Sequence, residues 1–119
     1  MGLLKAIIPE PSVSEYAAMI LAAGRAQLSK GITSASEAGA TPVLLDAYRA
    51  LDRANELPHR FHVMAMRLSE ESVRPLPLPP VHHSDALRID SVKLFADGGL
   101  SGATAALHGT YRHQAVRGL

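Results

Sequence analysis

Helix signals and strand signals alternate along this chain, and this alternation constrains its fold more than any other feature. Ser12 and Glu15 fit a capping box, which predicts a helix over residues 13–30. A threonine and a proline at 41–42 fit the N-cap and first turn of a second helix ending near Asn55. Strand signals follow each helix, and this order favours an α/β unit with parallel strands.

Three segments are strand candidates. RFHVMAM, residues 60–66, is mainly apolar on both faces, which is typical of a strand buried on both sides in a parallel sheet. GITSASEAG, residues 31–39, contains the β-branched residues Ile32 and Thr33, followed by small residues, and RIDSVKLFAD, residues 88–97, is the third candidate. Clustered prolines between the last two predict a surface connection over residues 69–85, with one short helix at most.

Composition limits the classes of protein to consider. With 119 residues, 47% of them hydrophobic and 19% charged, the chain is expected to be one globular unit over 1–119. A net charge of +1 without a basic stripe argues against nucleic acid and membrane surfaces as partners. The absence of cysteine excludes disulfides and thiolate metal sites. The start of the chain has no signal-like apolar run, so we expect a cytoplasmic protein.

VKLFADGG, residues 92–99, places one of only three lysines inside an apolar run. If the strand continues through this segment, Lys93 and Asp97 share one face, and Val92 lies on the other. In an α/β barrel, polar side chains near the carboxyl end of a strand point into the catalytic mouth. The alternative is a salt-bridged or snorkelling lysine on an edge strand, and periodicity alone favours that alternative.

VKLFADGGLSGATAAL followed by Tyr111 resembles the fourth-strand signature of metal-dependent amidohydrolases, in the branch that includes N-substituted formamide deformylase. GLLKAIIPEPSVSEY, GITSASEAG and LLDAYRALDRANELPHRFHVMAM resemble earlier segments of that family in the same order. The resemblance covers nearly the whole chain. It implies an α/β fold, a partial (β/α)8 barrel of about three parallel strands with flanking helices that corresponds to the second to fourth βα units.

The resemblance also implies a site. Members of the family use a bound divalent metal, zinc above all, to activate water against a C–N bond of a small amide-type substrate. Lys93 matches the fourth-strand ligand, where in a complete barrel CO2 addition turns the amine into a carbamate able to bind metal. The resemblance then implies Lys93 and Asp97 as catalytic residues, and Gly98, Gly99 and Ser101 as the substrate-binding loop. A bound cation would lower the pKa of its water toward about 7.

The sequence departs from the family pattern in ways that affect function. No His-x-His pair is present, Ala103 replaces a common arginine, and Ser36 replaces a common histidine. A complete barrel needs about 250 residues. We therefore expect a fragment-like unit that is inactive as an isolated chain. The alternative is a non-catalytic remnant of the barrel that buries its open sheet edges by forming a homo-oligomer.

Other candidate sites are weaker. Strand geometry separates His59 from His62, so metal binding by this pair is not expected. The pair at 82–83 is expected to be solvated in the proline-rich connection, able to bind a metal only opportunistically, and His108 and His113 lack an orienting partner. The glycine-rich segment DGGLSG lacks both the G-x-S-x-G pattern of a nucleophile elbow and a phosphate-binding signature.

Overall fold

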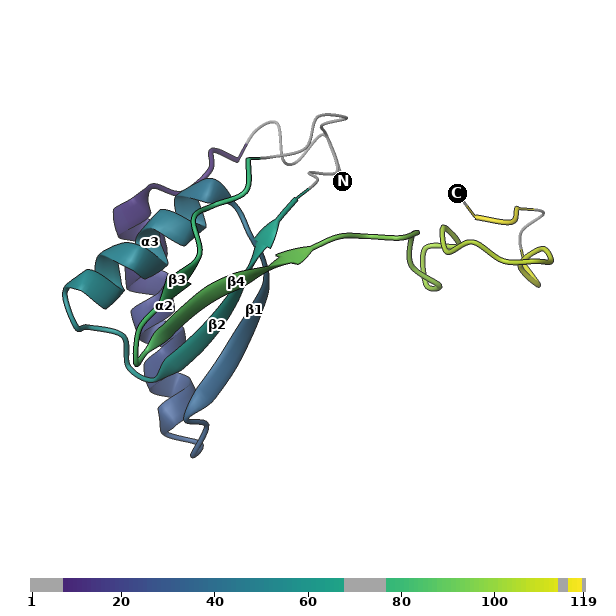
Figure 1. Ribbon diagram of the computed structural model, residues 1–119. Helices are drawn as coiled ribbons and strands as arrows, with labels where there is room; N and C mark the ends of the chain where they lie inside the picture. The colour runs from purple at the N-terminus through teal and green to yellow at the C-terminus, as the bar shows by residue number, and fades with distance from the viewer. Residues whose placement is uncertain (1–7, 68–76, 114–115, 119) are drawn as a thin grey trace.

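The computed structural model describes residues 8–67, 77–113 and 116–118, and in it two helices cover one face of a four-stranded sheet (Figure 1). The helices are α2 (Val13–Leu28) and α3 (Pro42–Arg53). The strands are β1 (Ser34–Ala40), β2 (Arg60–Met66), β3 (His82–His83) and β4 (Leu87–Lys93). No helix among these residues is long and apolar enough to cross a bilayer.

The strand order is β1-β2-β4-β3, and β1, β2 and β4 run parallel to one another. The prediction of three parallel strands is therefore confirmed. The two-residue strand β3 pairs antiparallel with β4 and was not expected, because it lies inside the proline-rich connection. Of the connection predicted over 69–85, residues 69–76 lie outside the described residues.

Local signals explain where the helices begin. Ser12 forms the predicted capping box, in which its Oγ accepts a hydrogen bond from the Glu15 N–H and its own N–H donates to Glu15 Oε2. The Ser12 hydroxyl, which also donates to Glu15 Oε2 at 2.7 Å, and then the Ser12 N–H hold the pKa of the Glu15 carboxyl below its usual value. Thr41 caps α3, with Pro42 in the first turn, and Asn55 follows the helix with a φ of 55°.

The hydrophobic core lies between the helices and one face of the sheet. Its largest contributions are Ile20 of α2, Leu45, Tyr48 and Leu51 of α3, and Phe61, Val63, Leu87 and Ile89 of the strands. The rings of Tyr48 and Phe61 meet with centroids 5.2 Å apart. Burial alternates along β2, so its second face is only half-buried and the expectation of two buried faces is wrong for this chain. No described helix covers that second face.

Two irregularities in strand pairing shape the sheet. The register between β1 and β2 shifts between Ala38 and Ala40, and Gly39 between them has a φ of 156°. A Cβ at Gly39 would lie 2.9 Å from Met66 Cε, so this position needs glycine for both reasons. A second shift, between His62 and Met64, lies in the pairing of β2 with β4.

The chain leaves the sheet after Lys93, and residues 94–113 run away from it (Figure 1). This segment folds on itself through local hydrogen bonds. The Leu107 N–H donates to Arg117 O at 2.9 Å, and the Tyr111 hydroxyl donates to Ala105 O at 3.0 Å. The strand predicted over residues 88–97 is therefore shorter at its carboxyl end than expected.

Candidate functional site

The face of the sheet opposite the helices, called the open face below, carries mostly polar side chains. They alternate along each strand with the buried residues that face the helices. The open face consists of Ser34, Ser36 and Ala38 of β1, Arg60, His62, Met64 and Met66 of β2, and Arg88, Asp90, Ser91 and Lys93 of β4. In a closed barrel this face would line the lumen.

Lys93 is the last residue of β4 and pairs with Met66, the last residue of β2. It therefore lies on the open face, at the carboxyl end of the parallel strands, where barrel enzymes place their reacting groups. Its Nζ is 4.8 Å from the centroid of the Phe95 ring, within the range of a cation–π contact. No carboxylate of the described residues forms an ion pair with it.

The other predicted site residues belong to the segment that leaves the sheet. Asp97 Oδ2 accepts a hydrogen bond from the Ala106 N–H at 3.0 Å, and the Gly99 N–H donates to Thr104 Oγ1 at 3.0 Å. Ser101 is exposed. Asp97 does not share a strand face with Lys93, because β4 ends at Lys93. The catalytic role of Asp97 and the substrate-binding roles of Gly98, Gly99 and Ser101 stay predictions.

Asp90 joins three strands on the open face and was not singled out from the sequence. Its carboxylate contacts His62 Nε2 at 2.9 Å, His83 Nε2 at 3.0 Å and the Arg88 Nη2 at 2.7 Å. The Arg88 guanidinium, followed by Ser91 and the two histidines, holds the pKa of Asp90 well below its usual range, although partial burial acts in the opposite direction. The register shift in β2 and β4 brings both Asp90 and Ser91 within reach of His62.

The remaining described histidines of the sheet region also have partners. His82 Nε2 lies 2.7 Å from Asp52 Oδ2 of α3, so the expectation of a solvated histidine is wrong for His82, whereas His83 is exposed as expected. His59 is buried and its ring stacks on Phe61 with centroids 4.2 Å apart. His59 Nε2 also contacts Gln27 Oε1 at 2.7 Å. His59 and His62 thus contact different partners, Gln27 and Asp90.

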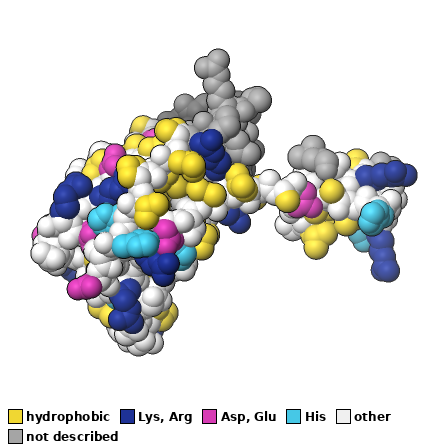
Figure 2. Space-filling view, in the orientation of Figure 1, with side chains coloured by type: hydrophobic (Ala, Val, Ile, Leu, Met, Phe, Trp, Pro, Cys, Tyr) yellow, Lys and Arg dark blue, Asp and Glu magenta, His cyan; other side chains and the backbone are white. Residues whose placement is uncertain are grey.

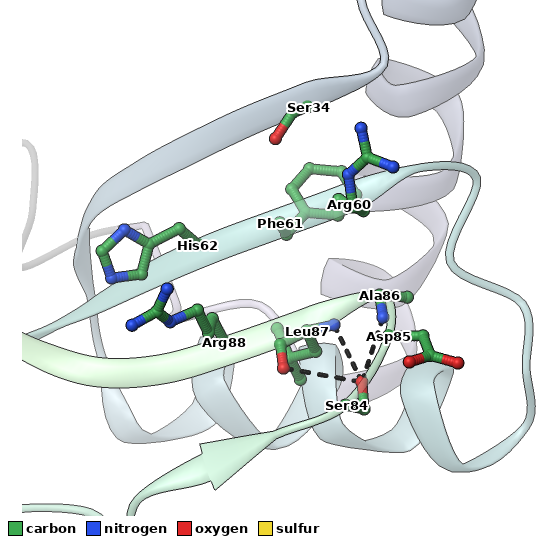
Figure 3. A pocket seen from close by; sticks show the side chains of 9 residues that line it. All are labelled: Ser34, Arg60, Phe61, His62, Ser84, Asp85, Ala86, Leu87 and Arg88. Carbon is green, nitrogen blue, oxygen red and sulfur yellow. Dashed lines mark hydrogen bonds between the residues drawn. The ribbon is translucent and has the colours of Figure 1, made fainter.

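A cavity of about 230 Å³ lies at the amino ends of the parallel strands (Figure 3). Arg60 lines one end of it, and His62 and Arg88 lie near each other at the other end. The turn before β4 closes one side, where Ser84 Oγ accepts hydrogen bonds from the Ala86 and Leu87 N–H groups. Because barrel enzymes react at the carboxyl ends of their strands, this cavity is not the candidate active site.

The described residues do not form a metal centre by themselves. No group of three or more histidine, cysteine, aspartate or glutamate side chains among them is arranged to hold an ion. Lys93 could supply one ligand at most, and its ammonium form has no lone pair with which to bind a cation. A metal at the carboxyl end of these strands would need further ligands from other βα units.

Three parallel strands with helices on one face define a partial (β/α)8 barrel, in agreement with the predicted fold class. The chain matches the sequence model of the amidohydrolase family over residues 1–119, and it belongs to that family. No curated protein matches it.

A solved structure supports the fold. The crystal structure of an uncharacterized metal-dependent hydrolase from Pyrococcus horikoshii OT3 superposes with a TM-score of 0.76 at 24% sequence identity. The matched region covers 91% of this chain and 22% of that protein, so the chain spans about a fifth of the length of its structural neighbour.

Proposed function

We propose that this chain is a section of a metal-dependent amidohydrolase that hydrolyses C–N bonds of small amide-type substrates, and that Lys93 supplies a metal ligand as its carbamate. One observation carries this proposal. Lys93 ends the third parallel strand on the open face, at the strand end where barrel enzymes assemble their sites. Membership of the amidohydrolase family gives that position its chemical meaning.

The proposed chemistry needs more than this chain contributes. A carbamate at Lys93 would be an oxygen ligand for a divalent cation, with zinc as our first choice, and the cation would supply activated water when bound. Because the described residues hold no three-ligand group, we propose that the isolated chain is inactive. The small-molecule substrate, the metal and a cytoplasmic location are parts of this proposal.

Carbamate formation at Lys93 can be measured directly on the whole chain. The protein is equilibrated with ¹³C-bicarbonate, with and without zinc, and carbon NMR detects the carbamate signal. We expect a signal that disappears in Lys93→Arg and persists in the control Lys30→Arg, since Lys30 is exposed beyond the end of α2. A carbamate signal that persists unchanged in Lys93→Arg would contradict the proposed role of Lys93.

A second candidate function is a non-catalytic module that self-associates. The observation that favours it is a run of exposed apolar side chains where the chain leaves the sheet: Val92, Leu94 and Phe95 are 43%, 55% and 56% exposed. Large exposed apolar groups of this kind mark surfaces that become covered by a partner. We propose that a homo-oligomer would bury them.

Sedimentation velocity separates the two candidates. The module predicts a homo-oligomer at micromolar concentration that dissociates in Leu94→Glu. The control Met19→Glu, at an exposed position of α2, should leave the oligomer intact. A wild-type chain that stays monomeric over a hundredfold range of concentration would exclude the self-associating module.

A further inference from the structure

The strand β3 is too short to hold its place by backbone pairing alone. It pairs with β4 only through His82 opposite Ile89 and His83 opposite Arg88. Each backbone hydrogen bond has a net value of only about 0.5–1.5 kcal/mol, and isolated two-stranded ribbons are marginal. Its side chains therefore decide whether β3 stays on the edge of the sheet.

On the helix side, His82 is held by α3. Its Nε2 lies 2.7 Å from Asp52 Oδ2, and the Ser84 hydroxyl donates to Asp52 Oδ1 at 2.7 Å. The Asp52 side chain is only 11% exposed, so it depends on these donors. The other charged group there is Arg49, also of α3, which donates to Pro80 O at 3.1 Å and faces Asp46 at 3.6 Å.

On the open face, His83 is held by β4. Its Nε2 lies 3.0 Å from Asp90 Oδ2, and the same carboxylate binds Arg88 of β4 and His62 of β2. Asp85 follows in the turn to β4 and is exposed. Histidine side chains gather beside acidic and basic ones over this part of the molecule (Figure 2). The two neighbouring histidines of β3 thus bind one carboxylate on each side of the sheet.

We propose that β3 is a detachable strap on the outer edge of β4, fastened by the His82–Asp52 and His83–Asp90 contacts, and that protonation of these histidines tightens it. A carboxylate accepts a hydrogen bond from a neutral imidazole, and it gains an ion pair when the imidazole becomes charged. His82 contributes the larger share, because His83 shares Asp90 with Arg88 and His62.

Detachment of β3 would expose the outer edge of β4. β4 is paired with β2 on one edge, and β3 covers the other edge only at Arg88 and Ile89. Detachment of β3 frees backbone donors and acceptors on that edge for pairing with another strand. Acidic conditions therefore close the edge, and neutral or alkaline conditions open it.

Hydrogen exchange of backbone amides, followed by NMR on the full chain at pH 5.5 and pH 8, tests this inference. After correction for intrinsic exchange, we expect protection of residues 82–89, relative to the β1–β2 ladder, to rise roughly threefold to tenfold at the lower pH. The variants His82→Gln and His83→Gln, made singly and together, keep a side-chain N–H donor but cannot gain charge. We expect each single variant to reduce the increase in protection at low pH, and the double variant to abolish it.

Two further variants complete the design. Asp52→Asn keeps an acceptor without a charge and should also reduce the rise, whereas His108→Gln, an exposed change far along the chain from β3, should leave it intact. Dividing the protection of residues 82–89 by that of the β1–β2 ladder separates detachment of β3 from global unfolding. Wild-type protection that is equal at both pH values, or a rise retained in the double glutamine variant, would overturn the inference.

Discussion

Asp90 shows how one side chain can connect strands that are separate in sequence. It accepts hydrogen bonds or ion pairs from Arg88 and Ser91 of its own strand, from His62 of β2 and from His83 of β3. Its surroundings hold its pKa well below the usual range, chiefly through Arg88. At the level of single residues, this carboxylate links three strands of the open face.

Removal of the Asp90 charge should change acid stability. A depressed folded-state pKa stabilises the fold above the unfolded value of about 3.9, and this contribution is lost as the pH falls through the folded value. We expect Asp90→Asn to be less stable than wild type at pH 6 and to lose less stability between pH 6 and pH 3. Urea unfolding at each pH measures both effects.

The exposed Asp46, whose side chain is 61% accessible, supplies the control for this experiment. Asp46→Asn should follow the wild-type pH dependence closely, because exposed pairs contribute little. An Asp90→Asn curve parallel to that of wild type would show that the Asp90 contacts do not stabilise the folded chain.

Position 24 of α2 requires glycine, because the helix approaches the chain before β2 closely at this point. A Cβ at this position would overlap the ring of Pro58. Gly24→Ala should therefore destabilise the protein by about 1–2 kcal/mol, although alanine favours a helix by about 1 kcal/mol. In a Pro58→Ala background the same change should become neutral or stabilising, and urea unfolding of the four proteins measures the coupling.

At the scale of elements, α3 is the helix that organises the core. Tyr48 is 5% exposed, and its ring packs on Phe61 of β2. Burial first, and the nearby Glu37 of β1 second, raise the pKa of Tyr48 to about 12. The interface between α3 and the sheet thus stabilises the neutral form of the Tyr48 phenol.

This shift predicts a loss of stability in alkali. Because the folded-state pKa lies above the unfolded value of about 10, the contribution is complete below pH 10 and is lost as the pH rises toward 12. Tyr48→Phe should flatten this part of the stability curve in urea unfolding between pH 9 and pH 11.5. The control Tyr111→Phe, in the segment beyond the sheet, should keep the wild-type slope.

At the scale of the whole molecule, the helix-and-sheet body and the carboxyl-terminal segment hold together by separate contacts. The hydrogen bonds of residues 97–118 described above join members of that segment to one another. The core residues lie between Ile20 and Ile89, apart from the segment's own Ala105. The body should therefore fold without the segment.

Truncation after Ala96 tests this separation. We expect the shortened chain to unfold in one cooperative transition, with a free energy of unfolding within about 0.5 kcal/mol of wild type, as for changes away from the core. Urea unfolding followed by circular dichroism provides the measurement. A loss of more than about 2 kcal/mol would mean that the segment packs on the body in solution.

Local chemistry explains which features could be predicted from the sequence. The capping box at Ser12, the cap at Thr41 and the apolar alternation of residues 60–66 act within a few residues, so helix starts and the central strand followed from them. The order of these signals, with the VKLFADGG segment, also indicated parallel strands and the amidohydrolase family.

Tertiary contacts decided the rest. His82 and His83 of β3 meet Asp52 and Asp90, which lie 30 and 7 positions away in the sequence, and no local pattern predicts these contacts. Backbone pairing likewise ends β4 at Lys93, which separates Lys93 from Asp97. The sequence by itself determined the kinds of elements and the family, because propensity and patterning are local. Only the folded sheet decided which charged groups come together, because their proximity depends on strand register.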